Sequence, residues 1–266
     1  MDNLFLYIIF ILNICVIVSS FSLFLSKRKE ASLILDIFLL FHFLAFTTFL
    51  ILFSFKLGRL PLATLYEFSL LFVWSIILFS ILLGLKIRNP SILLLISSTT
   101  LILFTFVSLL PHEPTGLMPA LQSKWLEAHV ATAIVAYGLF TISFCAGILY
   151  LINNRFSNTI LSENSPSQNI LTKTIHRLIQ VGFFALTLVL ITGSIWAEEV
   201  WGSWWSWDPK ETWALATWFL YAAYLHLQSK GKKHEKSSVI LSVFGFLVVL
   251  FTLFGVSYLM YGLHSY

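Results

Sequence analysis

Long apolar runs separated by short polar stretches make up most of this chain. A helix needs about 20 apolar residues to cross a hydrocarbon core roughly 30 Å thick, whereas a barrel strand alternates over about ten residues. The runs therefore predict an all-α, polytopic integral membrane protein with about eight transmembrane helices. The predicted spans are residues 4–25, 33–55, 62–85, 92–110, 126–152, 178–197, 213–227 and 239–261.

Composition supports the same fold class. Hydrophobic residues make up 58% of the 266 residues and charged residues 11%, against about 25% charged in a typical soluble domain. This balance excludes a soluble globular protein, a disordered chain and a nucleic-acid binder. Cys15 and Cys145 each lie alone in an apolar run, so neither a disulfide nor a thiol-exchange role is expected. The first run is expected to be a retained span rather than a signal peptide.

The Lys and Arg residues predict an orientation. If the loop after the first span is on the inner side, twelve of the sixteen lie inside and four outside, so the positive-inside rule places both termini outside. The inside set is Lys27, Arg28, Lys29, Lys86, Arg88, Arg155, Lys173, Arg177, Lys230, Lys232, Lys233 and Lys236. The outside set is Lys56, Arg59, Lys124 and Lys210.

Seven of the nine tryptophans fall between residues 196 and 218, in the segment WAEEVWGSWWSWDPKETWALATW. They are Trp196, Trp201, Trp204, Trp205, Trp207, Trp213 and Trp218. Tryptophan prefers the membrane interface, so an aromatic belt is one interpretation. Four tryptophans within seven residues, interleaved with Gly202, Ser203 and Ser206, favour a second: a platform for a large planar ligand at the membrane surface.

Three histidines help to decide between an aromatic belt and a ligand platform, because of where the predicted topology places them. His129 and His264 lie at the same face as the tryptophan segment, and two imidazoles at one depth resemble the axial ligands of a haem iron. His226 lies thirteen residues into the seventh predicted span, where an ionisable residue is expected to be functional. A helix-packing role for His226 is the alternative.

The other four histidines give weaker signals. His42 lies inside the second span, where a hydrogen bond within the bundle competes with a role as a further intramembrane ligand. His112 and His234 are expected to be solvated, and His176 to be interfacial.

The segment WGSWWSWDPKETWAL resembles the tryptophan-rich WWD signature of haem-handling proteins of cytochrome c biogenesis, and most closely the CcsA (ResC) branch, which is related to CcmC and CcmF. Further stretches resemble that branch: PLATLYEFSLLFVW, LMPALQSKWLEAHV, YLH and GLHSY. The resemblance covers residues 61–266, so we expect a haem-handling membrane domain there, with its WWD segment at about 196–218. Residues 1–60 are expected to form two transmembrane helices without a matched signature.

The resemblance implies a function and a set of site residues. Haem b would be held at the outer face by His129 and His264, and His226 would be a transmembrane ligand of haem in transit. The haem platform would comprise Trp201, Gly202, Trp204, Trp205, Trp207, Asp208, Pro209 and Glu211. Asp208 and Glu211 are also expected to cap the seventh helix as a capping box, and Lys210 is the candidate for a haem propionate.

The implied reaction is delivery of haem and its covalent attachment to the CxxCH cysteines of apocytochrome c. The protein would act as the CcsA subunit of a cytochrome c synthase, with a CcsB (ResB) membrane partner and a thiol-reducing protein as a further candidate partner. A bacterial plasma membrane is expected, with a thylakoid membrane as the alternative. Two other functions stay open: a haem exporter of the CcmC type, and a regulatory membrane protein of the same group. The resemblance assigns no catalytic residue.

The charge count predicts the outcome of reporter fusions. A reporter active only outside should work when fused after Tyr266 and be silent when inserted at residues 230–236, because the count places these positions on opposite sides. Enzyme activity of the two fusions in whole cells measures this, and the reverse pattern would contradict the predicted orientation.

Overall fold

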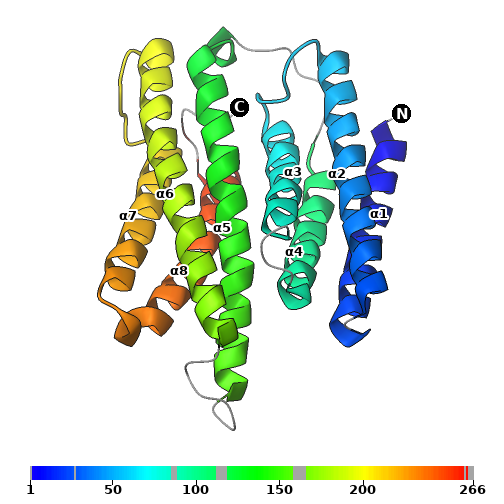
Figure 1. The fold of residues 1–266 in the computed structure, drawn as a ribbon. Helices are drawn as coiled ribbons and strands as arrows, with labels where there is room; N and C mark the ends of the chain where they lie inside the picture. Colours follow the sequence, from blue (N-terminus) through cyan, green and yellow to red (C-terminus); the bar gives the residue numbers. More distant parts are fainter. Residues whose placement is uncertain are drawn as a thin grey trace. The chain divides into compact units, whose positions relative to one another are not determined.

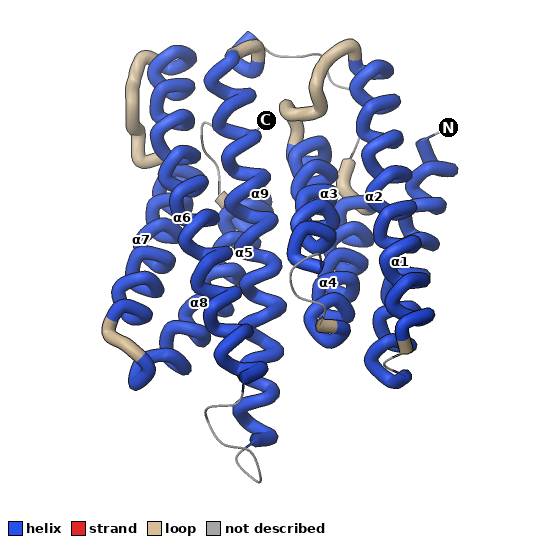
Figure 2. The backbone as a smooth tube through the Cα atoms, in the orientation of Figure 1, coloured by secondary structure: helices blue, strands red, loops and turns tan. Residues whose placement is uncertain are grey.

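All secondary structure in the described part of the chain is helical, as the apolar runs predict (Figure 2). The computed structural model describes residues 2–26, 28–84, 89–111, 119–157, 166–260 and 262. The internal contacts of the chain divide it into two compact units, Met1–Leu117 and Met118–Tyr266. The prediction of a boundary near residue 60, which rested on family signatures, stays a prediction.

The described residues of the N-terminal unit form four helices packed in a ring. They are α1 (Asp2–Ser26), α2 (Lys29–Leu57), α3 (Leu65–Gly84) and α4 (Pro90–Ser108). Each helix packs against the next in sequence, and α4 packs against α1. Asn89 caps α4 through its side-chain oxygen, which accepts from the N–H groups of Ser91 and Ile92, and Pro90 starts that helix.

The C-terminal unit repeats this arrangement with α5 (Lys124–Ser157), α6 (Pro166–Trp201), α7 (Pro209–Ser229) and α8 (Glu235–Leu250), shown from green to orange in Figure 1. The α5–α6 pair has the most extensive contact, and α8 returns to pack on α5. Short helical turns, η1 (Pro119–Leu121) and η2 (Lys232–His234), precede α5 and α8. The α8 helix continues through a π-helical turn, η3 (Phe251–Gly255), into α9 (Val256–Leu259).

Aromatic rings pack against glycines where these helices cross. Phe140 of α5 stacks on Tyr221 of α7, with ring centroids 3.7 Å apart and planes 7° apart. A β-carbon at Gly182 would lie 2.6 Å from the Phe140 ring, and one at Gly245 would lie 3.1 Å from the Tyr221 ring. Glycine at both positions therefore lets the neighbouring helix approach closely, as is common in membrane bundles.

Seven helical segments of the described chain are long and apolar enough to cross a membrane, which confirms an integral membrane protein. They are Leu4–Ser26, Lys29–Leu57, Leu65–Gly84, Pro90–Ser108, Lys124–Arg155, Gln168–Trp201 and Lys232–Leu259. The predicted span at residues 213–227 is helical, within α7, but is not among the seven. Its polar, tyrosine and tryptophan residues lower its hydropathy, so the prediction of eight spans is confirmed for seven of them.

An ion pair joins the α2–α3 connection to α3. The Arg59 guanidinium makes two hydrogen bonds of 2.7 and 2.8 Å to the Glu67 carboxylate, which also accepts from the Ala63 N–H at 2.8 Å. The bond to Glu67 is the main cause of a raised pKa for Arg59. Glu67 is buried, so these donors replace the water that its carboxylate would otherwise bind.

Replacing Glu67 should destabilise the N-terminal unit. We expect Glu67→Ala to lower the free energy of unfolding by about 1.5–3 kcal/mol, because it leaves the partly exposed Arg59 charge and the Ala63 N–H without their acceptor. Denaturant unfolding in detergent measures this change. The control is Glu127→Ala, which removes the partner of the exposed Lys124 and should cost about 1 kcal/mol or less. Equal losses in the two variants would contradict the prediction.

Candidate functional site

His129 lies near the start of α5 and faces α6. Its Nδ1 atom is 2.9 Å from the Val189 carbonyl oxygen. A carbonyl oxygen can only accept, so Nδ1 carries the proton and Nε2 is the basic nitrogen of the neutral ring. A β-carbon at Gly193 would lie 2.7 Å from Nδ1, so the absence of a side chain there gives the imidazole its place against α6. This hydrogen bond fixes the ring orientation, as in many metal-binding histidines.

A continuous series of aromatic rings leads from His129 to the end of α6. The His129 ring stacks against Trp196 with centroids 6.4 Å apart, and Trp196 meets Trp201 edge to face at 4.9 Å. Trp196 is 1% exposed, and its indole N–H donates to the Ala120 carbonyl oxygen just before α5. Trp196 is therefore a structural residue that ties α6 to the start of α5 and supports His129.

An irregular connection of seven residues, 202–208, follows Trp201 and is here named the WWD connection. Gly202 ends α6 in the left-handed conformation, with φ of 69°, and its N–H donates to the Glu198 carbonyl oxygen. Beyond it, Trp204 is 59% exposed and Trp207 is 70% exposed. Trp205 packs edge to face on Trp207, with ring centroids 5.9 Å apart. Large flat apolar faces are thus presented on a short non-helical segment.

Hydrogen bonds hold this connection against the start of α7. The Glu211 carboxylate accepts from the N–H groups of Ser206 and Asp208 at 2.9 and 3.2 Å, and Asp208 accepts from the Lys210 N–H at 2.9 Å. The capping box predicted from the sequence is confirmed. Trp207 lies between these anchors with φ of 59°, a conformation that side chains other than glycine adopt at a cost.

Lys210 begins α7 beside the Asp208 cap. Burial lowers the pKa of its ammonium, and the nearby Asp208 carboxylate opposes that shift. Its position next to the exposed tryptophans is compatible with pairing to a ligand carboxylate, and this role stays a prediction.

Two predicted members of the tryptophan cluster belong to helix packing. Trp213 meets Phe251 edge to face at 4.5 Å, and the Trp218 indole N–H donates to the Thr187 hydroxyl at 3.0 Å. The segment at 196–218 therefore comprises three parts: the end of α6, the WWD connection and the first half of α7.

His226 is exposed in the last turn of α7. Seventeen residues separate it from Pro209, or about 26 Å of helix at roughly 1.5 Å per residue. A site at His226 is thus separate from one at the WWD connection. The ring makes no hydrogen bond or ring-to-ring contact with the described residues, and the helix-packing alternative stays open.

The remaining histidines are distributed over both units. His42 is buried in the N-terminal unit, and its Nε2 atom has no hydrogen-bond partner among the described residues. His176 is half-buried on α6, and His234 lies in the turn before α8. His112 and His264 lie outside the described residues.

Gly262, two positions before His264, packs against the cap of α7. A β-carbon at Gly262 would clash with the Asp208 carboxylate and would lie 2.9 Å from the Pro209 ring. The close approach of the C-terminal segment to the WWD connection therefore requires glycine at this position.

No group of three or more His, Cys, Asp and Glu residues suited to a metal ion occurs within the described ranges. Sequence reasoning also missed the contacts that orient His129. Val189, Gly193 and Trp196 lie 60 or more positions further along the chain, and neither the glycine nor the valine stands out in an apolar run.

Comparisons with known proteins agree with one another. Residues 62–264 match the family described as cytochrome C assembly protein. The cytochrome c biogenesis protein CcsA of Guizotia abyssinica is 34% identical, over 79% of this chain and 78% of the relative. The CcsA of Prochlorococcus marinus (strain AS9601) is 37% identical, over 90% and 86%. Among solved structures, the cytochrome c heme lyase CcmF superposes with a TM-score of 0.74 at 15% identity, covering 95% of this chain and 46% of CcmF.

The capping box generates a testable prediction about α7. We expect Asp208→Ala to lower the free energy of unfolding by about 1 kcal/mol and to speed amide exchange at residues 206–212, because the Lys210 N–H loses its acceptor. Asp208→Asn keeps an acceptor oxygen and should stay close to the parent. Hydrogen exchange followed by mass spectrometry, with thermal unfolding in detergent, measures both. Indistinguishable exchange in the two variants would contradict the role of the cap.

Proposed function

This chain belongs to the family of cytochrome c assembly proteins, and from that membership we propose that it binds haem and delivers it to apocytochrome c. The observation that carries the proposal is the series of rings from His129 through Trp196 to Trp201, which the exposed tryptophans of the WWD connection follow directly in sequence. It combines a preoriented imidazole with a flat aromatic surface, and haem needs both. The proposed site lies at the outer face of the membrane.

His129 supplies one axial ligand in this proposal. Its Nδ1–H is engaged by Val189, which makes Nε2 the metal-binding atom and raises its basicity. The exposed faces of Trp204 and Trp207 would cover the apolar porphyrin surface. Trp201, Gly202 and Trp205 give that surface its shape, and Asp208, Pro209 and Glu211 hold it in place.

His264 supplies the second axial ligand. The packing of Gly262 against Asp208 and Pro209 supports this assignment, because it brings the C-terminal segment to the WWD connection within two residues of His264. Two imidazoles would close both axial positions of the iron, which limits reaction with oxygen and sets its potential. A histidine of the incoming CxxCH segment would then displace one of them.

Delivery ends in covalent attachment. In each thioether bond the sulfur of a CxxCH cysteine bonds to one vinyl carbon of haem and the thiol hydrogen goes to the other. No electrons are exchanged with a further reactant. The part of this chain is to hold the vinyl edge accessible to the apoprotein, which an exposed platform does and a closed pocket would not.

His226 is assigned to haem in transit, at a second position about 26 Å of helix away from the platform. Its exposure on α7 supports an opposite ligand from another membrane protein, which we propose to be a CcsB-type subunit. The complex would act as a cytochrome c synthase in a bacterial plasma membrane or a thylakoid membrane, with haem b as its substrate.

Removal of either proposed outer ligand tests the assignment. The purified protein should show a low-spin bis-histidine haem spectrum. His129→Ala and His264→Ala should each weaken haem binding by more than about tenfold, because even loss of a partner that only orients a ligand costs about 10–100-fold. Absorption titration with haem measures this, and cytochrome c maturation in cells should be lost in parallel.

His234→Ala provides the matched control, since it removes an imidazole from the turn before α8. It should keep the spectrum and the maturation of the parent protein. Parent-like spectra and maturation in both His129→Ala and His264→Ala would remove these residues as ligands, and would return the tryptophans to the role of an interfacial belt.

A further inference from the structure

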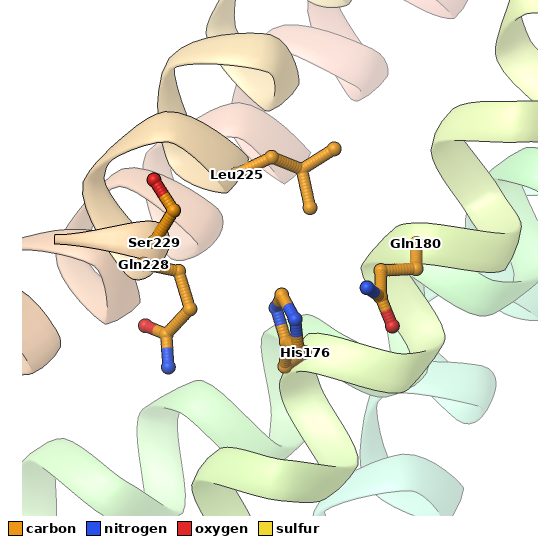
Figure 3. A pocket seen from close by; sticks show the side chains of 5 residues that line it. All are labelled: His176, Gln180, Leu225, Gln228 and Ser229. Carbon is orange, nitrogen blue, oxygen red and sulfur yellow. The ribbon is translucent and has the colours of Figure 1, made fainter. Parts of the chain in front are cut away.

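A second polar site lies between α6 and α7, at the end of α7 remote from the WWD connection. It is an open pocket of about 330 Å³ lined by His176 and Gln180 of α6 and by Leu225, Gln228 and Ser229 of α7. Figure 3 shows the His176 ring directed between the two helices, with Gln180 and Gln228 on either side. Its volume is at the lower limit of small-molecule sites, so it suits one part of a larger ligand.

The pocket lacks a partner for one of its polar atoms. The Nδ1 atom of His176 is buried and has no hydrogen-bond partner among the described residues. A buried ring nitrogen left in this state costs free energy unless a ligand or water satisfies it. The nearby Tyr224 ring, 6.2 Å from the imidazole, contributes an apolar wall rather than a hydrogen bond.

The side-chain amide of Gln228 can donate a hydrogen bond to a ligand. Its Oε1 atom accepts from the Ser238 hydroxyl at 2.7 Å, so its NH₂ group is the end available to a ligand. The Ser229 hydroxyl already donates to the His226 carbonyl oxygen. The Gln228 amide thus offers an N–H donor, the Gln180 amide and the His176 imidazole can supply further ones, and no acidic side chain lines the pocket.

Exposed cations lie at the same end of the helices. Lys173 precedes His176 by one turn of α6, Arg177 follows it directly, and Lys230 follows Ser229. Neutral donors inside and cations within a turn of them favour an anion with an apolar body, since a cation would meet repulsion and a neutral ligand would gain nothing from the charges.

We propose that this pocket binds the propionate carboxylates of haem while the iron is held at His226. The inference rests on the proposed function and assigns residues that the histidine and tryptophan motifs do not include. Leu225 directly precedes His226 and Ser229 follows it by three positions, so about one turn of α7 would serve both the carboxylates and the metal. His176 and Gln180 are positioning residues that orient the porphyrin by its charged edge.

Binding of two different porphyrins distinguishes carboxylate binding by this pocket from a purely structural role of its residues. The full-length protein with both His129→Ala and His264→Ala, in phosphatidylcholine nanodiscs, is titrated with haem and with haem dimethyl ester, whose carboxylates are blocked. This background lacks both proposed outer ligands, so the absorption change reports on the inner position. We expect His176→Ala and Gln180→Glu each to weaken haem binding by about tenfold and to leave ester binding within about twofold.

Asn154→Asp is the matched control, since it adds the same charge as Gln180→Glu at the end of α5, outside the pocket lining. It should leave both affinities unchanged. Equal weakening of haem and ester, or no change in either, would overturn the proposal. So would an effect that appears only in phosphatidylglycerol nanodiscs, because the pocket would then hold an anionic lipid headgroup.

The test also distinguishes the two proposals from each other. Absence of haem from the parent protein would contradict the proposed function itself. A parent protein with a bis-histidine spectrum, combined with a His129→Ala, His264→Ala background that binds no haem, would overturn the inner position alone.

Discussion

The candidate site depends on the Glu211 carboxylate and the two backbone N–H groups that it accepts from. A non-helical segment at the end of a membrane helix must find partners for its backbone polar groups, and Ser206 and Asp208 both donate to this one side chain. With both ends held, Trp207 can occupy a left-handed conformation that an unrestrained chain would avoid. The backbone on both sides of Trp207 is therefore held by hydrogen bonds from within the protein, without a ligand.

The parts of this arrangement that are local in sequence were predictable. Asp208, Pro209 and Glu211 form a capping signature whose partners lie within five residues, and the apolar runs set the helices in the same way. The orientation of His129 was not predictable, because Val189 and Gly193 reach it only through the packing of α5 on α6. The tryptophans show the same division. Trp204 and Trp207 are exposed as a platform requires, whereas Trp196 and Trp218 are taken up by hydrogen bonds to other elements.

The α7 helix explains why one of the predicted spans differs from the rest. It begins with the cap of the WWD connection, ends beside His226, and carries polar and aromatic residues along its length, which lower its hydropathy. It is also held laterally on α6 and α8 by contacts such as that between Trp218 and Thr187. A helix with a proposed haem position at each end has fewer residues available for lipid contact. Its low hydropathy is therefore compatible with packing between α6 and α8.

The energetics of the platform suit a protein that must release what it binds. The exposed parts of Trp204 and Trp207 amount to roughly 200–300 Å² if each ring buries about 150–250 Å² in full. A planar ligand covers one face of each ring, or about half of that area, which is worth roughly 2.5–4 kcal/mol at about 25 cal/mol per Å². In the proposed site, such a contribution would orient haem but would be far too small to retain it. Retention would then fall to the proposed axial imidazoles, and exchange of one imidazole for the histidine of an incoming CxxCH segment would remove much of the affinity in a single step. Replaceable metal ligands combined with a weakly binding aromatic surface would thus let haem be handed over without first dissociating into the membrane.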